Sequence, residues 1–462
     1  MPLRARSKLR QARLPGLHEM NVRKTLYFTY ARLRGHSIGK AVKSVGKEWP
    51  LATAAEAAGR SLRAMLSHAQ KNVPYYRDYL GGLNLDKMAV DELLRVLGRL
   101  PVMTKDIIRR DFERLKSNDL SSRQWYYNTS GGSTGEPIRL VQDREYNTHG
   151  MALAWLAYRC MGYEYGDRKV LVWGSERDIL QGTVGVKAKL FRWLENCRTL
   201  NAFRMTPEDM RRFLETMDER PARLIIAYAQ ALYELAQFAE AESIRVRPQS
   251  AATASAGTLY PYMRETIQRV FQCPVYNLYG SREVGLVATE LPGREGLWVP
   301  PGAQYVEIVS DSGDPSGPGQ VGSILVTCLY SYAMPLIRYR IGDRGAFAWV
   351  RGGQQVLENV FGREVDAFRR SDGTLIDGEY FTHLVYFRPW VQKFQFVQTS
   401  NESVVLSVVL PEGCARPPQT ELDALSDGVC KVLGPATKVQ FDWVKEIPPS
   451  PSGKYRYTIS RC

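Results

Sequence analysis

Hydrophobic and polar residues follow two different periods along the middle of the chain. Short apolar runs at residues 169–174 (KVLVWG), 223–228 (RLIIAY) and 274–280 (PVYNLYG) have the length and composition of buried strands. Longer segments between them, including residues 144–162 and 229–242, have a helical period. Strands that alternate with helices of this length predict a largely parallel sheet with helices on its faces.

The pattern changes twice towards the C-terminus. After Arg294, short apolar runs are separated by Gly- and Pro-rich turns such as residues 312–322 (SGDPSGPGQVG), which predicts antiparallel strands. The last hundred residues combine alternating strands at 393–398 and 403–410 with a helical segment at 420–434. This part of the sequence predicts a small α+β domain.

We therefore expect an α/β protein with a large N-terminal domain and a small, mobile α+β domain. The large domain should contain mostly parallel sheets flanked by helices and a β subdomain. The predicted division has three parts: residues 1–100 as a basic helical segment packed on the main domain, residues 101–362 as the large domain, and residues 363–462 as the C-terminal lid.

The N-terminal region is strongly basic. Residues 1–47 hold twelve Lys and Arg residues and one acid, Glu19. Four apolar residues are spaced as on one face of a helix, with basic residues on the other faces: Val22, Leu26, Tyr30 and Leu33. We expect this helix to pack on the main domain with its basic side in solvent, or to lie on an anionic membrane surface. No nucleic-acid partner is expected, because no zinc-finger spacing, RNP signature or basic leucine-zipper pattern occurs.

The composition favours a globular protein and argues against a membrane-spanning, secreted or metal-cluster protein. The 462 residues carry a net charge of +14 and are 44% hydrophobic, which is enough for a large core. No apolar run is long enough to span a membrane, and the N-terminus has no apolar segment of the secretory type. Seven scattered cysteines without a CxxC pair, and five histidines without HxxxH spacing, predict reduced thiols and no metal cluster. The sequence predicts a cytoplasmic protein.

Residues 129–137 (TSGGSTGEP) form the first candidate for chemistry. Glycines allow positive φ angles that aim successive backbone N–H groups at a phosphate. The segment is not a Walker A loop, because Gly135 is followed by Glu136 and not by Lys-Ser/Thr. Strand-like runs flank it on both sides. Its own residues leave two alternatives open, a phosphate cradle and a polar turn.

Three later segments bear on that choice. Residues 276–285 (YNLYGSREVG) place Glu283 after a buried strand, as a Mg²⁺ ligand or as the partner of an arginine such as Arg282. Residues 333–345 (AMPLIRYRIGDRG) place Asp343 in a turn, where it binds a ribose or only shapes the turn. Residues 448–457 (PPSPSGKYRY) hold Lys454, as a catalytic group or as a solvated lysine.

Taken together and in this order, the segments resemble the adenylate-forming (AMP-binding) superfamily. Within it they are most similar to the phenylacetate–coenzyme A ligase-like branch, which includes CapK-type proteins found with capsular polysaccharide biosynthesis. The resemblance runs from about Pro101 to the C-terminus, and its longest match is residues 319–343 (GQVGSILVTCLYSYAMPLIRYRIGD). Residues 362–368 (GREVDAF) resemble the family's hinge motif.

The resemblance implies a set of ATP- and Mg²⁺-binding residues. The loop residues that would hold the β- and γ-phosphates are Ser130, Gly131, Gly132, Ser133, Thr134 and Gly135. Tyr279 would pack near adenine with Gly280 and Ser281 beside it. Asp343 would hold the ribose and Arg363 the ribose or phosphate. The two catalytic residues would be Glu283, which helps to bind Mg²⁺, and Lys454, which bridges the carboxylate and the α-phosphate.

The implied reaction is activation of a carboxylic acid by ATP to an acyl-adenylate, followed by transfer to coenzyme A. Val365 stands where the hinge motif usually has an acid, and the acid here is Asp366. This departure keeps a second acceptor open, an amine or hydroxyl on a glycan precursor or metabolite. A third alternative is a non-catalytic nucleotide-binding relative, against which Lys454, Glu283 and Asp343 argue. The motifs identify neither the acid nor the oligomeric state.

Overall fold

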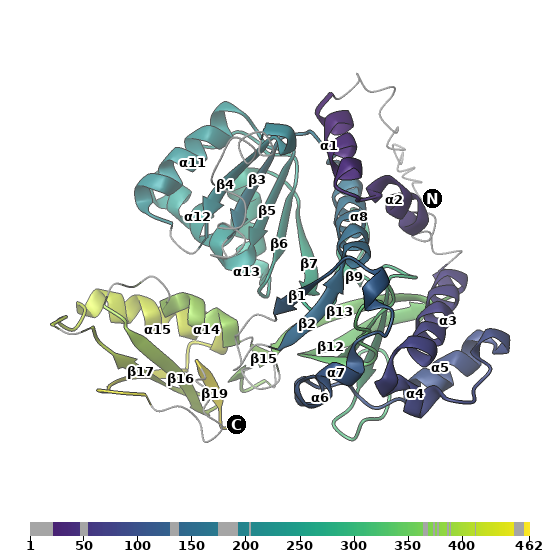
Figure 1. Cartoon of the computed structure of the whole chain (residues 1–462). Helices are drawn as coiled ribbons and strands as arrows, with labels where there is room; N and C mark the ends of the chain where they lie inside the picture. Colours follow the sequence, from purple (N-terminus) through teal and green to yellow (C-terminus); the bar gives the residue numbers. More distant parts are fainter. Residues whose placement is uncertain are drawn as a thin grey trace, which may run out of the picture.

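Figure 1 shows the computed structural model of the chain. The structure describes residues 22–46, 54–129, 138–173, 193–202, 205–363, 368–372, 375–376, 378–385, 388, 390–411, 413–447 and 457–462.

A twisted sheet of eleven strands runs through the large domain in the order β10-β11-β12-β13-β9-β8-β7-β6-β5-β3-β4. Its parallel half consists of β3 (Lys169–Trp173), β4 (Cys197–Asn201), β5 (Leu224–Tyr228), β6 (Ala252–Ser255) and β7 (Val275–Ser281). These strands confirm the parallel sheet predicted from the apolar runs.

Helices cover both faces of the parallel half (Figure 1). They are α8 (Arg144–Cys160) on one face, and α11 (Pro207–Glu219), α12 (Ala229–Ala241) and α13 (Pro261–Phe271) on the other. Side chains of β5 alternate between the two layers, because successive residues of a strand point to opposite faces. Ile225 and Ala227 pack with α11–α13, whereas Leu224 and Ile226 pack in a cluster with Tyr158 of α8.

The other half of the sheet is antiparallel, as predicted. It consists of β8 (Gly285–Thr289), β9 (Leu297–Trp298), β10 (Gln304–Val309), β11 (Gly322–Cys328), β12 (Tyr339–Arg351) and β13 (Gln354–Arg363). The predicted turn at Asp343 is wrong, since this residue lies inside β12. Gly342 adopts φ 96° and the β12–β13 register shifts between Asp343 and Arg344. Such an irregularity bends a strand without ending it.

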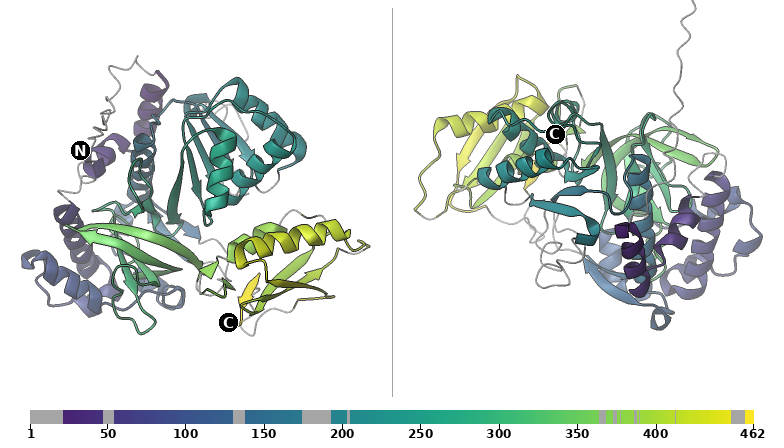
Figure 2. Two further views of the ribbon diagram at one scale, coloured as in Figure 1. Left: turned by 180° about the vertical axis from the view of Figure 1, so that it is seen from behind. Right: turned by 90° about the horizontal axis from the view of Figure 1, so that it is seen from above.

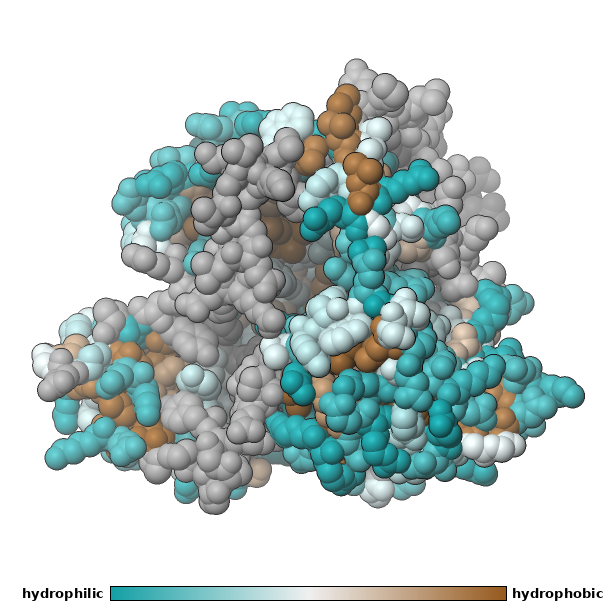
Figure 3. Space-filling view, in the orientation of Figure 1, coloured by the Kyte–Doolittle hydropathy of each residue, from teal (hydrophilic) through white to brown (hydrophobic). Residues whose placement is uncertain are grey.

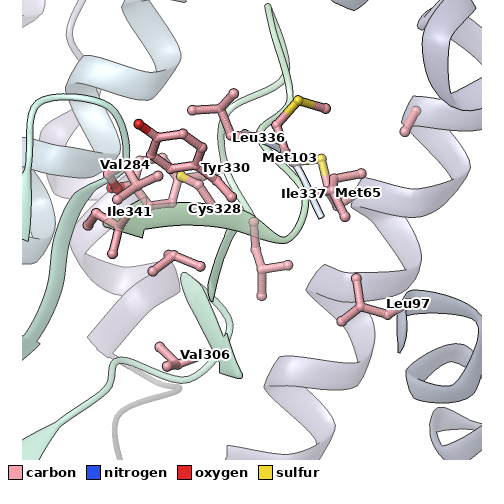
Figure 4. Packing of buried hydrophobic residues seen from close by; sticks show 14 of the residues in the cluster. Met65, Leu97, Met103, Val284, Val306, Cys328, Tyr330, Leu336, Ile337 and Ile341 are labelled. Atoms are coloured by element: carbon pink, nitrogen blue, oxygen red, sulfur yellow. The ribbon is translucent and has the colours of Figure 1, made fainter. Parts of the chain in front are cut away.

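The N-terminal helices pack against the antiparallel half in one core. They are α3 (Ala54–Asn72), α4 (Pro74–Leu80), α5 (Val90–Arg99), α6 (Lys105–Arg110) and α7 (Phe112–Leu115), with the 3₁₀ helices η2 (Leu85–Lys87) and η3 (Leu120–Ser122). Figure 4 shows Met65 of α3, Met103 and Ile337 within this core. Thr104 caps α6 as its sequence predicts, because its hydroxyl accepts a hydrogen bond from the Ile107 N–H at 3.3 Å.

The predicted N-terminal helix exists, as α1 (Val22–Leu33), but its predicted buried face is wrong. Val22, Leu26, Tyr30 and Leu33 are all exposed, whereas Tyr27 and Ala31 are buried. Tyr27 stacks on Tyr165 at 4.2 Å between ring centroids. These aromatic contacts hold the buried face of the helix against the protein. The next helix, α2 (Ile38–Gly46), packs against α8.

The C-terminal residues form a separate four-stranded sheet with two helices, which confirms the predicted α+β unit (Figure 2). Its elements are α14 (Gly378–Val385), α15 (Gln419–Leu433), β16 (Lys393–Ser400), β17 (Ser403–Val409), β18 (Lys438–Trp443) and β19 (Thr458–Ser460), preceded by the short pair β14 (Phe368–Arg369) and β15 (Leu375–Ile376). Lys431 Nζ lies 2.6 Å from the Tyr233 hydroxyl of α12. We propose that the C-terminal domain begins at residue 363, where β13 ends.

Candidate active site

A pocket of about 890 Å³ lies at the carboxyl ends of four parallel strands. Each strand contributes its last residue: Trp173 from β3, Tyr228 from β5, Ser255 from β6 and Ser281 from β7. Open α/β sheets bind their ligands at this edge, because the connections that follow the strands diverge there. The pocket is therefore the candidate active site.

Aromatic side chains form much of the pocket wall. The Trp173 and Tyr228 rings lie 4.3 Å apart between centroids and are inclined by 45°. Tyr158 of α8 and Tyr126 of β1 (Trp125–Thr129) also line the pocket. Among the lining residues that the structure describes, Arg282 is the only charged one. The wall thus suits an apolar or aromatic group, and Arg282 adds one positive charge to it.

The sequence YGSREVG folds as a tight hairpin between β7 and β8. Gly280 is required by a close approach, since a Cβ added there would lie 2.4 Å from the Gly285 carbonyl oxygen. Gly285 adopts φ 75°, a conformation that other residues rarely take. The hairpin places residues 282–284 at its tip, directly after the pocket-lining Ser281.

Backbone carbonyls at this tip accept hydrogen bonds from surrounding elements. Gln142 Nε2 donates to the Arg282 carbonyl at 2.9 Å, and Gln304 Nε2 donates to the Val284 carbonyl at 2.7 Å. The Tyr146 hydroxyl donates to the Arg282 carbonyl at 3.3 Å. Burial raises the pKa of Tyr146 well above its ordinary value, so its hydroxyl keeps the proton that it donates. The hairpin tip is therefore held in one position.

Glu283 has a buried side chain at this tip. It is 7% exposed, and the Tyr339 hydroxyl donates to its Oε1 at 3.4 Å. Within the described residues Glu283 forms no ion pair, so the salt bridge with Arg282 considered from the sequence is not present there. A buried carboxylate that no described cation pairs with is costly, and a bound cation would offset that cost.

Tyr279 and Asp343 are brought together from two strands that are far apart in the sequence. The Tyr279 hydroxyl donates to Asp343 Oδ2 at 2.7 Å. Across the β12–β13 pair, Asp343 lies opposite Arg363 in the register. The backbone thus gathers three of the residues predicted to hold a nucleotide, whereas the side chain of Arg363 lies outside the described part of the structure.

Ser130–Gly135 and Lys454 lie outside the described residues. The strands that flank the Ser130–Gly135 loop are confirmed, as β1 (Trp125–Thr129) and β2 (Arg139–Asp143), which pair in antiparallel register with Thr129 opposite Arg139. Because Tyr126, Tyr127 and Asn128 of β1 line the pocket, this strand leads from the pocket into the predicted phosphate loop.

The side-chain oxygens of Ser281 and Glu283 suit a Mg²⁺ ion that is also bound by a substrate phosphate. The Ser281 hydroxyl is buried and has no hydrogen-bond partner in the part of the chain that the structure describes. Glu283 supplies one buried carboxylate nearby in sequence. Mg²⁺ is usually held by one or two carboxylates together with substrate phosphates. The described residues contain no group of three or more His, Cys, Asp or Glu that would form a metal site from protein ligands alone.

Trp173 lines the pocket although no sequence motif includes it. Its position near the carboxyl end of the strand predicted at residues 169–174 could have singled it out, because residues there face the ligand edge. Tyr158 and Asn147 of α8 also line the pocket, and nothing in their spacing distinguishes them from other helix residues.

The sequence is similar to one protein-domain family and to two known proteins. Residues 368–461 match the CapK C-terminal domain family. Over 424 residues the chain is 25% identical to Protein CapK of Staphylococcus aureus, which covers 85% of this chain and 86% of that protein. It is 24% identical over 264 residues to the mitochondrial acyl-coenzyme A synthetase ACSM6 of Homo sapiens, covering 51% of this chain and 53% of the human one.

Solved structures identify the fold. A 2-hydroxyisobutyryl-CoA ligase in its postadenylation state superposes with a TM-score of 0.58 at 17% identity, covering 88% of this chain and 89% of that one. The same ligase in its thioesterification state gives a TM-score of 0.55 at 18% identity, covering 89% and 90% of the two chains. The chain thus has the fold of the adenylate-forming ligases, is similar to Protein CapK over most of its length, and matches the CapK C-terminal domain family at residues 368–461.

Proposed function

We propose that this protein uses ATP to activate a carboxylic acid as an acyl-adenylate, with release of pyrophosphate, and then transfers the acyl group to coenzyme A. The observation that carries the proposal is the pocket at the carboxyl ends of β3, β5, β6 and β7, which is bordered by the YGSREVG hairpin. The fold adds support, because the similar 2-hydroxyisobutyryl-CoA ligase structures hold an acyl-adenylate, and one also holds coenzyme A.

In this proposal Tyr279 and Asp343 bind the nucleoside. The Asp343 carboxylate accepts hydrogen bonds from ribose hydroxyls, and the Tyr279 hydroxyl fixes one of its oxygens. The ring of Tyr279 lies beside adenine, with Gly280 and Ser281 next to it. Ser130 through Gly135 hold the β- and γ-phosphates, and Arg363 adds a cation to ribose or phosphate. These residues position the α-phosphorus for attack.

Electrostatic repulsion opposes the first half-reaction, because the carboxylate and the polyphosphate are both negatively charged. Glu283 would hold Mg²⁺, which when bound neutralises charge on the phosphates. Lys454 would approach the carboxylate oxygen and the α-phosphate oxygen and stabilise the charge that develops between them. The part of the acid beyond its carboxylate would contact the rings of Trp173 and Tyr228, which form an aromatic part of the pocket wall.

Residues 363–462 would act as a mobile domain in the cytoplasm, with Lys454 delivered for adenylation and withdrawn afterwards. Withdrawal exposes the acyl-adenylate to its acceptor. Water must be excluded while both anions meet, so a closing domain also protects the adenylate from hydrolysis.

A second acceptor is favoured by a specific observation. The C-terminal match is to the CapK C-terminal domain family, and Val365 departs from the hinge acid usual in coenzyme A ligases. In this alternative the acyl-adenylate passes to an amine or hydroxyl of a glycan precursor or metabolite. The adenylation half-reaction and all residues assigned to it are the same.

The test is exchange of labelled pyrophosphate into ATP across a panel of carboxylic acids, followed by assay for a thioester with coenzyme A. We expect acid-dependent exchange that Lys454→Ala abolishes and that Lys445→Ala, the same change at an exposed lysine of the same domain, leaves intact. Exchange that persists in Lys454→Ala contradicts the role of this lysine. Exchange without thioester supports the second acceptor, and a lack of exchange with every acid supports a non-catalytic nucleotide-binding relative.

A further inference from the structure

Helix α1 has a second apolar face, whose side chains are exposed or partly exposed. Val22 is 60% exposed, Leu26 43%, Tyr30 40% and Leu33 82%. At 100° per residue, these four side chains fall in one stripe along the helix. Tyr27 and Ala31, which attach α1 to the rest of the protein, lie outside this stripe, about 100° and 140° around the helix from its middle. We call Val22, Leu26, Tyr30 and Leu33 the α1 stripe.

The surroundings of the α1 stripe are aromatic and basic. The guanidinium of Arg23 lies 5.0 Å from the ring centroid of Trp193, whose side chain is 51% exposed. Arg32 and Arg34 are exposed at the end of the helix. Figure 3 shows hydrophobic side chains gathered on the outer surface of α1 at the top of the view. The face therefore combines aliphatic, aromatic and cationic groups.

The sequence before α1 adds further positive charge. Residues 1–21 hold five Lys or Arg residues and one acid, Glu19. The region as a whole, residues 1–47, holds twelve basic residues and that single acid. An exposed apolar stripe joined to a polybasic segment combines the two attractions that anionic membranes offer, hydrophobic burial and electrostatics.

We propose that the α1 stripe docks this protein on an anionic lipid bilayer, with α1 lying in the plane of the interface. The helix has twelve residues, and no helix in the described ranges is long and apolar enough to cross a membrane. Val22, Leu26 and Leu33 would enter the acyl boundary. Tyr30 and Trp193 would sit at headgroup level, where amphipathic rings are favoured.

Charge argues against the other occupants of this face. A second copy of the chain would bring two strongly basic surfaces together, and like charges across an interface oppose association. A nucleic acid would meet the cations but would leave the exposed leucines in water, because its outer surface is phosphate. An anionic bilayer satisfies both parts of the face at once. This inference is independent of the reaction proposed above.

The test is co-flotation of the full chain with vesicles of phosphatidylcholine containing about 30 mol% phosphatidylserine. We expect binding to these vesicles, weak binding to pure phosphatidylcholine, and at least a ~10-fold loss of partitioning in Leu26→Glu/Leu33→Glu. The matched control is Val321→Glu/Val350→Glu, which places the same charges at two other exposed apolar residues and should float like the wild type. Thermal unfolding of all three proteins checks that each is folded.

Two further readouts separate lipid from other occupants. Raising the salt from about 0.1 M to about 0.5 M should weaken binding, because surface charge is screened. Trp193→Phe should lose part of the fluorescence quenching produced by brominated lipid. The proposal is overturned if the stripe variant floats as well as wild type, or if the wild type does not float. It is also overturned if the wild type is a dimer that the stripe variant converts to a monomer without any lipid binding.

Discussion

The Tyr279 hydroxyl donates a 2.7 Å hydrogen bond to Asp343, joining the end of β7 to β12 across the large sheet. The two residues belong to different motifs of the sequence, and the contact brings those motifs to one place. Tyr279 lines the pocket. Asp343 is thereby held at the pocket's edge with one carboxylate oxygen already bonded.

Replacing Tyr279 by Phe should weaken ATP binding more than catalysis. The variant keeps the ring and loses the hydroxyl, so Asp343 loses a donor that fixes its carboxylate. Hydrogen bonds to charged groups contribute about 1.5–3 kcal/mol, which corresponds to a ~10- to 100-fold rise in KM for ATP in pyrophosphate exchange. Tyr276→Phe, the same change on the same strand, is the control and should leave KM unchanged. Equal effects of the two variants would contradict a specific role for the Tyr279–Asp343 bond.

Glu283→Gln should raise the Mg²⁺ concentration that half-saturates exchange. The amide has nearly the same shape, and the buried site can still accept the Tyr339 hydrogen bond, but it lacks the negative charge that Mg²⁺ requires. We expect at least a ~100-fold loss of exchange at fixed Mg²⁺, of the size seen when one electrostatic group is removed from an active site. Unfolding temperature should not fall, since a buried charge is removed. An unchanged Mg²⁺ titration would exclude Glu283 as the ligand.

Trp173→Ala should change which acids are activated. Removing the indole opens space beside Tyr228 at the end of β3. Acids that contact the ring should lose about 1–3 kcal/mol of binding, a ~10- to 100-fold loss in kcat/KM, while bulkier acids gain relative to them. KM for ATP should stay within about twofold. A uniform loss with every acid and with ATP would indicate a structural defect and not an acyl contact.

Glu234→Gln should stabilise the protein increasingly as pH rises from about 4.5 to about 7, and fully above that range. Burial raises the pKa of Glu234 to about 7, while Gln230 Nε2 donates to its Oε1 at 3.2 Å. A carboxyl whose pKa is higher in the folded state than in the unfolded state loses stability as pH rises from about 4.5 to about 7. Each pKa unit corresponds to about 1.4 kcal/mol. Chemical denaturation at both ends of this range should show equal stability at low pH and a more stable variant above pH 7. A constant difference across the range would contradict the raised pKa.

Much of the fold could be predicted because its determinants are local. Thr104 and Thr206 cap α6 and α11 with their hydroxyls, and a cap depends only on the next few residues. The strands on either side of residues 130–137 follow from short apolar runs. The order of the motifs also follows from the chain itself, and with it the resemblance to adenylate-forming enzymes that the fold bears out.

The sequence by itself thus determined most of the helices and strands, their order, and which residues are candidates for binding ATP and Mg²⁺. Only the tertiary structure decided that Asp343 lies inside β12, opposite Arg363 and bonded to Tyr279. It also decided which of two helically spaced faces of α1 is buried. The physical reason is the same in both cases. Local periodicity fixes what a segment can become, but contacts between residues distant in sequence fix its register and its buried face, and these depend on packing that no single segment encodes.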